Sequence, residues 1–149
     1  MDELISRQMP HSVEAEQAVL GSILIDERCI PQVVEHLRPA DFYLRQNREI
    51  FETVCSMFNY SETIDPVTVL DKMKQTGVYD EATSYDYIRQ LMVVTPTAAN
   101  VEQYIGIVKD KALLRQVAET AGTITALVQE GTATAQEALD AAEQRIFAI

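Results

Sequence analysis

A chain of 149 residues fits one domain, or one small domain with an appendage. Hydrophobic residues make up 47% of it, which is enough for a buried core and excludes a disordered chain. The net charge is −11, with 16 acids and 8 bases in residues 1–100 and 7 acids and 4 bases in residues 101–149. Because nucleic-acid binding relies on Lys and Arg to neutralise phosphates, the chain alone is not expected to bind DNA tightly.

Nothing in the sequence predicts a membrane span or a leader. No apolar run approaches the roughly 18–20 residues of a membrane helix. The N-terminus carries Asp2 and Glu3 and lacks the basic start and apolar stretch of a signal peptide. We therefore expect a cytoplasmic protein with no membrane partner. Cys29 and Cys55 are expected to be buried small hydrophobic residues in a reducing compartment, although a disulfide is not excluded.

The first half of the chain predicts short helices. Residues 1–11 are polar and predict a flexible N-terminal tail. Ser12 predicts the N-cap of a first helix, which ends near Asp26. Gly21 lies inside this helix, where it costs about 1 kcal/mol relative to Ala, so we expect another backbone to pack closely against it. A short second helix follows, with Pro31 tolerated in its first turn.

A third helix is expected over residues 45–58, and an acid beside two aromatic residues precedes it. Asp41 stands directly before Phe42, which we expect to anchor in the core. The Asp41 carboxylate then predicts a structural cap that accepts backbone N–H groups, and contact with a partner is the alternative.

Two further helices complete the predicted head. Asp65 followed by Pro66 predicts an N-cap and a first helical residue, so Asp65 is the second predicted structural cap. Gly77 is the expected stop of that helix. Ser84 or Thr83 predicts the cap of the next one. No long segment alternates with a period of two, so no sheet is expected.

One helix between Pro96 and Gly131 is too long for its own domain. About 30 residues with a rise of 1.5 Å each give a rod of roughly 45 Å, whereas a domain of this size is nearer 30 Å across. Residues 135–149 repeat the apolar pattern and can fold back as a hairpin, but this segment is only about half as long. The sequence thus predicts an all-α fold, with a compact head of about five helices (12–96) and a helical hairpin (97–149) that another chain covers.

The sequence contains no motif that predicts a catalytic, cofactor-binding or metal-binding site. None of its five glycines belongs to a phosphate-binding loop, so no ATP or other cofactor site is predicted. Its two His and two Cys residues lack metal-ligand spacing, and no nucleophile stands in a catalytic motif. The nearest basic cluster is formed by Arg38, Arg45 and Arg48, for which a solvated helix face is favoured over a phosphate contact. Catalytic, cofactor-binding and metal residues are therefore all predicted to be absent.

Several segments resemble a known family in order and spacing. The run EAEQAVLGSIL from Glu14 to Leu24 resembles the opening helix of the N-terminal domain of the bacterial replicative DNA helicase, the DnaB family. The later matching segments, in the family's order, are DFY (41–43), IF (50–51), IDPVTV (64–69), PTAANV (96–101), Tyr104, IV (107–108), LLR (113–115), AE (142–143) and IF (146–147). The resemblance covers nearly the whole chain, from about Pro10 to Ile149.

The resemblance implies an assembly role within a larger enzyme. In this family the hairpins pair between subunits, and six N-terminal domains form a collar arranged as a trimer of dimers. The parent would be an ATP-dependent helicase that encircles single-stranded DNA and unwinds duplex DNA at the replication fork. Its ATPase domain, with ATP and Mg, would lie beyond residue 149. The fragment would be non-catalytic, would recruit the C-terminal domain of primase, and would meet single-stranded DNA only through the full hexamer.

The resemblance also directs attention to particular residues. The predicted self-association seam consists of Ile105, Val108, Ala112, Leu113 and Val117, with a hairpin core within one chain as the alternative. The predicted primase contacts are Ile124, Leu127 and Val128 near the hairpin tip, with Tyr87 on the head. For Tyr87, core filling with the hydroxyl at the rim is the alternative. We expect Ile105→Asp or Val108→Asp to break the assembly without unfolding the head.

Two other functions remain open at this point. One is the helicase-binding helical domain of primase, whose fold resembles that of the helicase domain. The other is a stand-alone acidic helical enzyme or regulator, which nucleotide binding by this fragment would favour. Light scattering across a concentration series tests the assembly reading, with a dimer as the expected state of the isolated chain.

Overall fold

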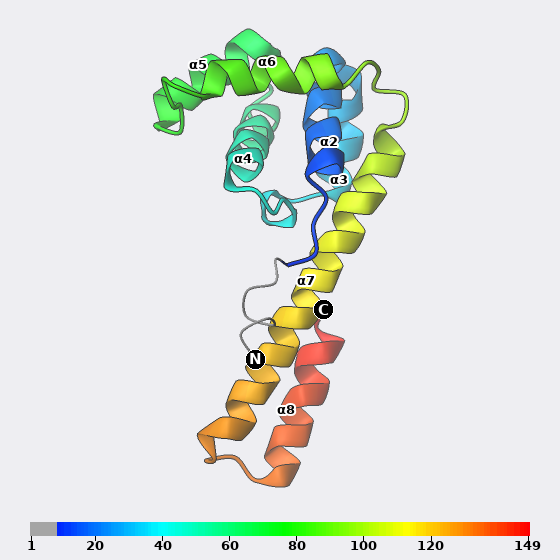
Figure 1. The fold of residues 1–149 in the computed structure, drawn as a ribbon, viewed down its shortest axis with the longest axis vertical. Coiled ribbons are helices and arrows are strands. Elements are labelled where there is room, and N and C mark those ends of the chain that lie inside the picture. The colour runs from blue at the N-terminus through cyan, green and yellow to red at the C-terminus, as the bar shows by residue number, and fades with distance from the viewer. Residues whose placement is uncertain (1–8) are drawn as a thin grey trace. The chain divides into compact units, whose positions relative to one another are not determined.

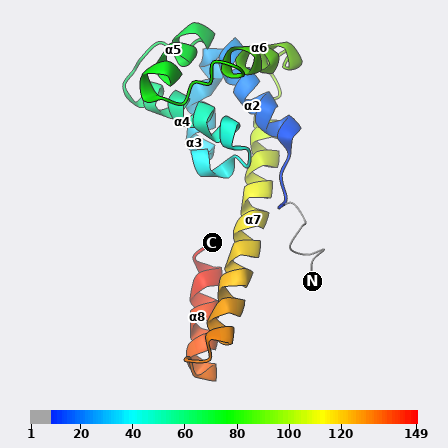
Figure 2. The same ribbon diagram turned by 60° about the vertical axis from the view of Figure 1, so that its left-hand side comes forward.

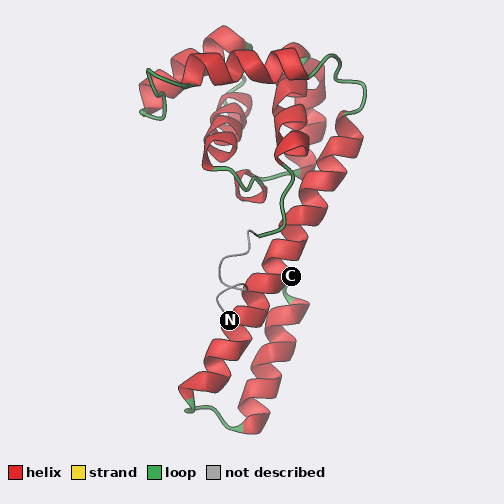
Figure 3. Ribbon diagram, in the orientation of Figure 1, coloured by secondary structure: helices red, strands yellow, loops and turns green. Residues whose placement is uncertain are grey.

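The computed structural model describes residues 9–149, and over these residues it contains helices and loops but no strand (Figure 3). The predicted all-helical class is confirmed. The chain divides into two compact units. We call residues His11–Lys109 the bundle, and residues Asp110–Ile149 together with Met9 and Pro10 the hairpin unit. The predicted tail over residues 1–11 falls largely outside the described residues and stays a prediction.

The bundle is built from five α-helices and the first turns of a sixth. They are α2 (Val13–Ile25), α3 (Ile30–His36), α4 (Arg45–Asn59), α5 (Pro66–Thr76), α6 (Ser84–Val94) and the start of α7 (Val101–Glu130). Short 3₁₀ turns, η1 (Glu27–Cys29) and η2 (Pro39–Asp41), flank α3. Figures 1 and 2 both draw α6 lying across α2, and these two helices form the most extensive helix pair of the bundle.

The helix ends follow from local hydrogen bonds. Ser12 Oγ accepts the backbone N–H of Ala15 at the start of α2. At the start of α5, Asp65 Oδ1 accepts the N–H of Thr68 at 2.8 Å, and Thr68 Oγ1 accepts the N–H of Asp65 at 2.9 Å. Gly77 ends α5 with φ +80°, a conformation that costs a glycine little. Reciprocal caps of this kind satisfy N–H groups that the first turn of a helix leaves unbonded.

The bundle core is one continuous apolar cluster. It takes residues from every helix of the bundle, and the Phe42 and Phe51 rings lie 4.8 Å apart at its centre. Val101, Ile105 and Val108 from the start of α7 belong to the same cluster. The first turns of α7 are therefore core elements of the bundle.

The hairpin unit pairs two antiparallel helices. The later part of α7 and α8 (Ala135–Phe147) lie side by side in both views (Figures 1 and 2). Gly131 turns the chain between them with φ +75°, and Thr134 caps α8 by accepting the N–H of Glu137 at 3.1 Å. No residue of α8 is buried. The pairing of these two helices thus leaves most of the α8 surface open.

Candidate functional site

The hairpin unit exposes large apolar side chains along α7. Leu113 is 48% exposed and Val117 is 49% exposed, and Val128 is exposed more fully. A helix turns by about 100° per residue, so positions 113, 117, 124 and 128 fall within about 60° of one another and form one stripe, the α7 stripe. Ile124 of this stripe is partly buried. Contiguous apolar surface of this kind is typical of an interaction site in a water-soluble domain.

The second helix of the hairpin adds to this apolar surface. Leu139 and Ile146 of α8 are both more than half exposed, and Phe147 is almost fully exposed. The charged side chains of α8 are mainly acidic. They are the acids Glu137, Asp140 and Glu143 and one base, Arg145. A single chain therefore leaves apolar groups on both helices of the hairpin in water.

The five residues of the predicted self-association seam separate into two groups. Ile105 and Val108 are 5% and 2% exposed and belong to the bundle core, so they offer almost no surface to a second chain. Ala112 is also buried within the single chain. Leu113 and Val117 remain available. The bundle core thus already covers Ile105 and Val108 in a single chain, whereas the part of Leu113 and Val117 in self-association stays a prediction.

The predicted primase contacts also differ in exposure. Val128 is exposed, whereas Ile124 and Leu127 are partly buried. Tyr87 is half-buried on α6 and packs against the bundle core. The structure does not assign a partner to any of these four residues, and their primase contact stays a prediction.

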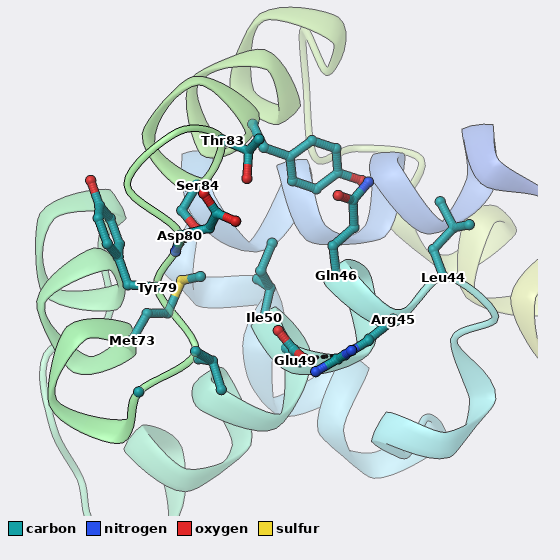
Figure 4. Close-up of a pocket in the computed structure, with 13 residues that line it drawn as sticks. Leu44, Arg45, Gln46, Glu49, Ile50, Met73, Tyr79, Asp80, Thr83 and Ser84 are labelled. Atoms are coloured by element: carbon teal, nitrogen blue, oxygen red, sulfur yellow. Dashed lines mark hydrogen bonds and ion pairs between the residues drawn. The ribbon is translucent and has the colours of Figure 1, made fainter.

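Tyr87 lines a groove on the bundle of about 570 Å³. Figure 4 draws it between the start of α4 and the loop that joins α5 to α6. Arg45 and Glu49 lie together on the α4 side, where Arg45 Nε and Glu49 Oε1 are 2.8 Å apart. Tyr79 and Asp80 lie on the loop side. Since Arg45 is already paired with Glu49, Asp80 leaves the lining of the groove with a negative balance.

The hydroxyl of Tyr87 is part of a buried polar network. It donates to Asn47 Oδ1 in a short hydrogen bond and accepts from Gln17 Nε2 at 3.4 Å. Gln46 also lines the groove. Burial raises the pKa of Tyr87 above its ordinary value. The phenol therefore stays protonated and serves as a fixed hydrogen-bonding group.

Glu16 is the residue that the sequence reading missed. It is only 1% exposed, although it is an acid in the first turn of α2. Its carboxylate accepts the backbone N–H of Tyr43 at 2.9 Å, the N–H of Leu44 at 3.3 Å and Asn47 Nδ2 at 3.0 Å. Glu16 thereby fixes the two residues that precede α4 and the Asn47 side chain in its first turn. Its spacing from Leu20 and Ile23 on the buried face of α2 was the available signal.

Asp41 closes the η2 turn and does not cap α4, the helix that follows it. Its Oδ2 accepts the backbone N–H of Arg38 at 2.8 Å, which closes the η2 turn. Phe42 is buried as expected. Asp41 thus orders the chain before Phe42, whereas Glu16 binds the backbone that leads into α4.

The two cysteines, which the sequence predicts to be buried, are half-buried in the structure. Burial raises the pKa of Cys29 and of Cys55 to about 11, and both cysteines are free. Within residues 9–149 no cluster of three or more His, Cys, Asp or Glu side chains has the arrangement of a metal site. The helices in the same range are too short or too polar to cross a bilayer.

Comparison with known sequences identifies similar proteins. A family model described as the DnaB-like helicase N terminal domain matches residues 8–110. The chain is similar to the replicative DNA helicase DnaB of Leifsonia xyli subsp. xyli, with 30% identity over 99% of this chain and 32% of the relative. It is also similar to the replicative DNA helicase DnaB of Geobacillus stearothermophilus, with 35% identity over 100% of this chain and 33% of the relative. The chain thus spans about a third of the length of these relatives.

Solved structures give the same result for the fold. The chain superposes on the N-terminal domain of DnaB helicase from Mycobacterium tuberculosis with a TM-score of 0.88 and 32% identity, covering 95% of this chain and 100% of that one. The N-terminal domain of DnaB helicase from Helicobacter pylori, described with its interactions with primase, matches with a TM-score of 0.67 and 24% identity. That match covers 78% of this chain and 90% of the other. At this lower identity the likeness concerns the fold alone.

Proposed function

Because the chain belongs to the family of DnaB-like helicase N-terminal domains, we propose that it is the non-catalytic assembly and primase-interaction domain of a hexameric replicative DNA helicase. The parent protein uses ATP and Mg in its remaining two thirds and unwinds duplex DNA at the replication fork, in the cytoplasm. Single-stranded DNA meets this domain only in the assembled hexamer, since the chain carries a net charge of −11. The family match favours this function over a primase domain or a stand-alone regulator.

The exposed α7 stripe is the observation that carries the assembly role. Leu113 and Val117 are large apolar side chains that remain half exposed beside a helix, α8, which buries none of its own residues. A second hairpin of the same kind would cover both helices and form a four-helix arrangement, the usual way in which such stripes are buried. We therefore assign dimer formation to the hairpin unit, and a trimer of such dimers to the hexamer.

The primase contact is assigned to two surfaces. One is the hairpin tip, where Val128 is exposed and Ile124 and Leu127 are partly so. The other is the groove that Tyr87 lines on the bundle. The similar domain from Helicobacter pylori is described with its interactions with primase, and the C-terminal helical domain of primase is the partner that the family resemblance implies.

Light scattering across a concentration series tests the assembly role. We expect the wild-type chain to be a dimer, and Leu113→Asp or Val117→Asp to be monomeric because an unpaired charge would be buried at the seam. Gln129→Asp is the matched control, because residue 129 is exposed and lies about 120° around the helix from residue 117. A wild-type chain that stays monomeric at high concentration would contradict the assembly role of the hairpin unit.

A further inference from the structure

In the hydrogen-bond network between Glu16 and Tyr87, the donor and the acceptor of each bond are fixed. A carboxylate only accepts hydrogen bonds, and all three groups bonded to Glu16 are donors. One of them is the Asn47 amide nitrogen, so the Asn47 oxygen must point the other way, toward Tyr87. The Tyr87 hydroxyl must then donate its only hydrogen bond to that oxygen. Asn47 is completely buried, so water cannot relax this constraint.

These donor and acceptor roles decide which kind of hydrogen bond Tyr87 can form with a partner at the groove. With its proton committed to Asn47, the phenolic oxygen has only acceptor capacity left. In the isolated chain that capacity is taken up by the Gln17 amide, at a long distance of 3.4 Å. This interaction is replaceable, because so long a contact contributes little.

We infer that Glu16 is a positioning residue: through Asn47 it orients the Tyr87 hydroxyl as an acceptor only, and this selects a partner that brings a hydrogen-bond donor to the groove. The inference rests on the proposed contact between Tyr87 and primase. The negative balance of the groove, with Asp80 on its rim, favours a cationic donor, a Lys or Arg side chain of the primase C-terminal domain.

Glu16→Gln reverses the direction of the network. The amide nitrogen of the new glutamine would replace one of the two carboxylate oxygens. It would then face either the Tyr43 N–H or the Asn47 side chain. The first choice leaves the Tyr43 N–H without its 2.9 Å acceptor, whereas the second loses only the longer bond from Leu44, at 3.3 Å. In the second arrangement Asn47 turns over and its nitrogen faces Tyr87. The Tyr87 hydroxyl then accepts from Asn47 and points its proton outward.

The first test is nuclear magnetic resonance of the isolated chain. In Glu16→Gln we expect new nuclear Overhauser contacts between the Asn47 side-chain amide protons and the Tyr87 ring protons, which the wild-type chain lacks. Glu14→Gln is the matched control, since Glu14 is an exposed acid on the same helix. An Asn47 amide that keeps its wild-type contacts in a folded Glu16→Gln chain would overturn the inference.

The second test is binding of the primase C-terminal helical domain. We expect Tyr87→Phe and Glu16→Gln each to weaken binding about tenfold, Glu14→Gln to leave it unchanged, and the double variant to be no weaker than either single one. Additive losses, or full affinity in Glu16→Gln, would overturn the selection of a donor. No binding by the wild-type chain would instead contradict the proposed function, and the resonance experiment would still decide the direction of the network.

Discussion

Gly21 of α2 lies against Thr95 at the end of α6, and a Cβ atom added to Gly21 would stand 2.1 Å from Thr95 Oγ1. The same atom would stand 2.5 Å from the backbone carbonyl oxygen of Leu91. A side-chain hydroxyl can rotate away, but a helix carbonyl moves only with its helix. The close approach of α2 and α6 therefore depends on the absence of a side chain at position 21.

Gly21→Ala is expected to destabilise the bundle by roughly 1–3 kcal/mol in urea unfolding. The cost of separating α2 from α6 exceeds the gain of about 1 kcal/mol that alanine gives a helix. Gly106→Ala on α7 is the matched control, because a Cβ there meets no atom within 4 Å, and we expect it to stabilise the chain slightly. Equal stability of the two variants would mean that the helices separate without cost.

Local signals in the sequence predicted the local features of the fold. The glycine in α2 indicated a close neighbour because it weakens the helix that contains it, and the structure supplies that neighbour as α6. The Asp65–Pro66 pair predicted the start of α5 because capping involves residues only three positions apart. The cap is a local signal, whereas the glycine signals a close neighbour without naming it, since Leu91 and Thr95 lie 70 or more residues away in the chain.

Features that depend on distant partners were beyond the sequence. Ile105 and Val117 belong to one run of apolar residues, yet Ile105 is buried in the bundle core and Val117 is half exposed. The two residues lie about 120° apart around α7, and the packing of the other helices decides which of these faces is covered. Glu16 was missed for the same reason, because its donors at Tyr43, Leu44 and Asn47 lie 27 to 31 residues away.

The core position of Ile105 reverses the expected outcome of one substitution. Ile105→Asp is now expected to unfold the bundle, with a loss of about 3–5 kcal/mol, because the charge would be buried without a partner. Leu113→Asp is expected to keep the helical content and the melting transition of the bundle, because Leu113 is half exposed. Circular dichroism melts measure the difference. An Ile105→Asp chain that melts like wild type would return Ile105 to the seam.

The two cysteines are expected to be alkylated slowly in the folded chain, at a rate that rises steeply with pH. Their pKa lies near 11 in the folded chain, against 9.0 for an exposed thiol, so the thiolate fraction at pH 8 is about 100-fold lower. Alkylation should accelerate about tenfold per pH unit up to pH 11, and unfolding in urea should restore the ordinary rate at pH 8.

The same shift sets the sign of a stability change with pH. Unfolded thiols lose their protons above about pH 9 and folded ones only near pH 11, so stability falls across this range. Cys29→Ser and Cys55→Ser separate the two contributions. Rapid alkylation of the folded chain at pH 8 would contradict the raised pKa of both thiols.

Asp65 provides a clean measure of how much one cap contributes. Asp65→Ala removes the acceptor for the Thr68 N–H and should cost about 1 kcal/mol in urea unfolding. Asp65→Asn keeps an acceptor oxygen and loses only the charge at the helix N-terminus, so its cost should be a few tenths of a kcal/mol. Asp71→Ala, at an exposed site in the same helix, should lie within about 0.5 kcal/mol of wild type. If Asp65→Ala and Asp65→Asn were equally destabilised, the charge rather than the hydrogen bond would stabilise the start of α5.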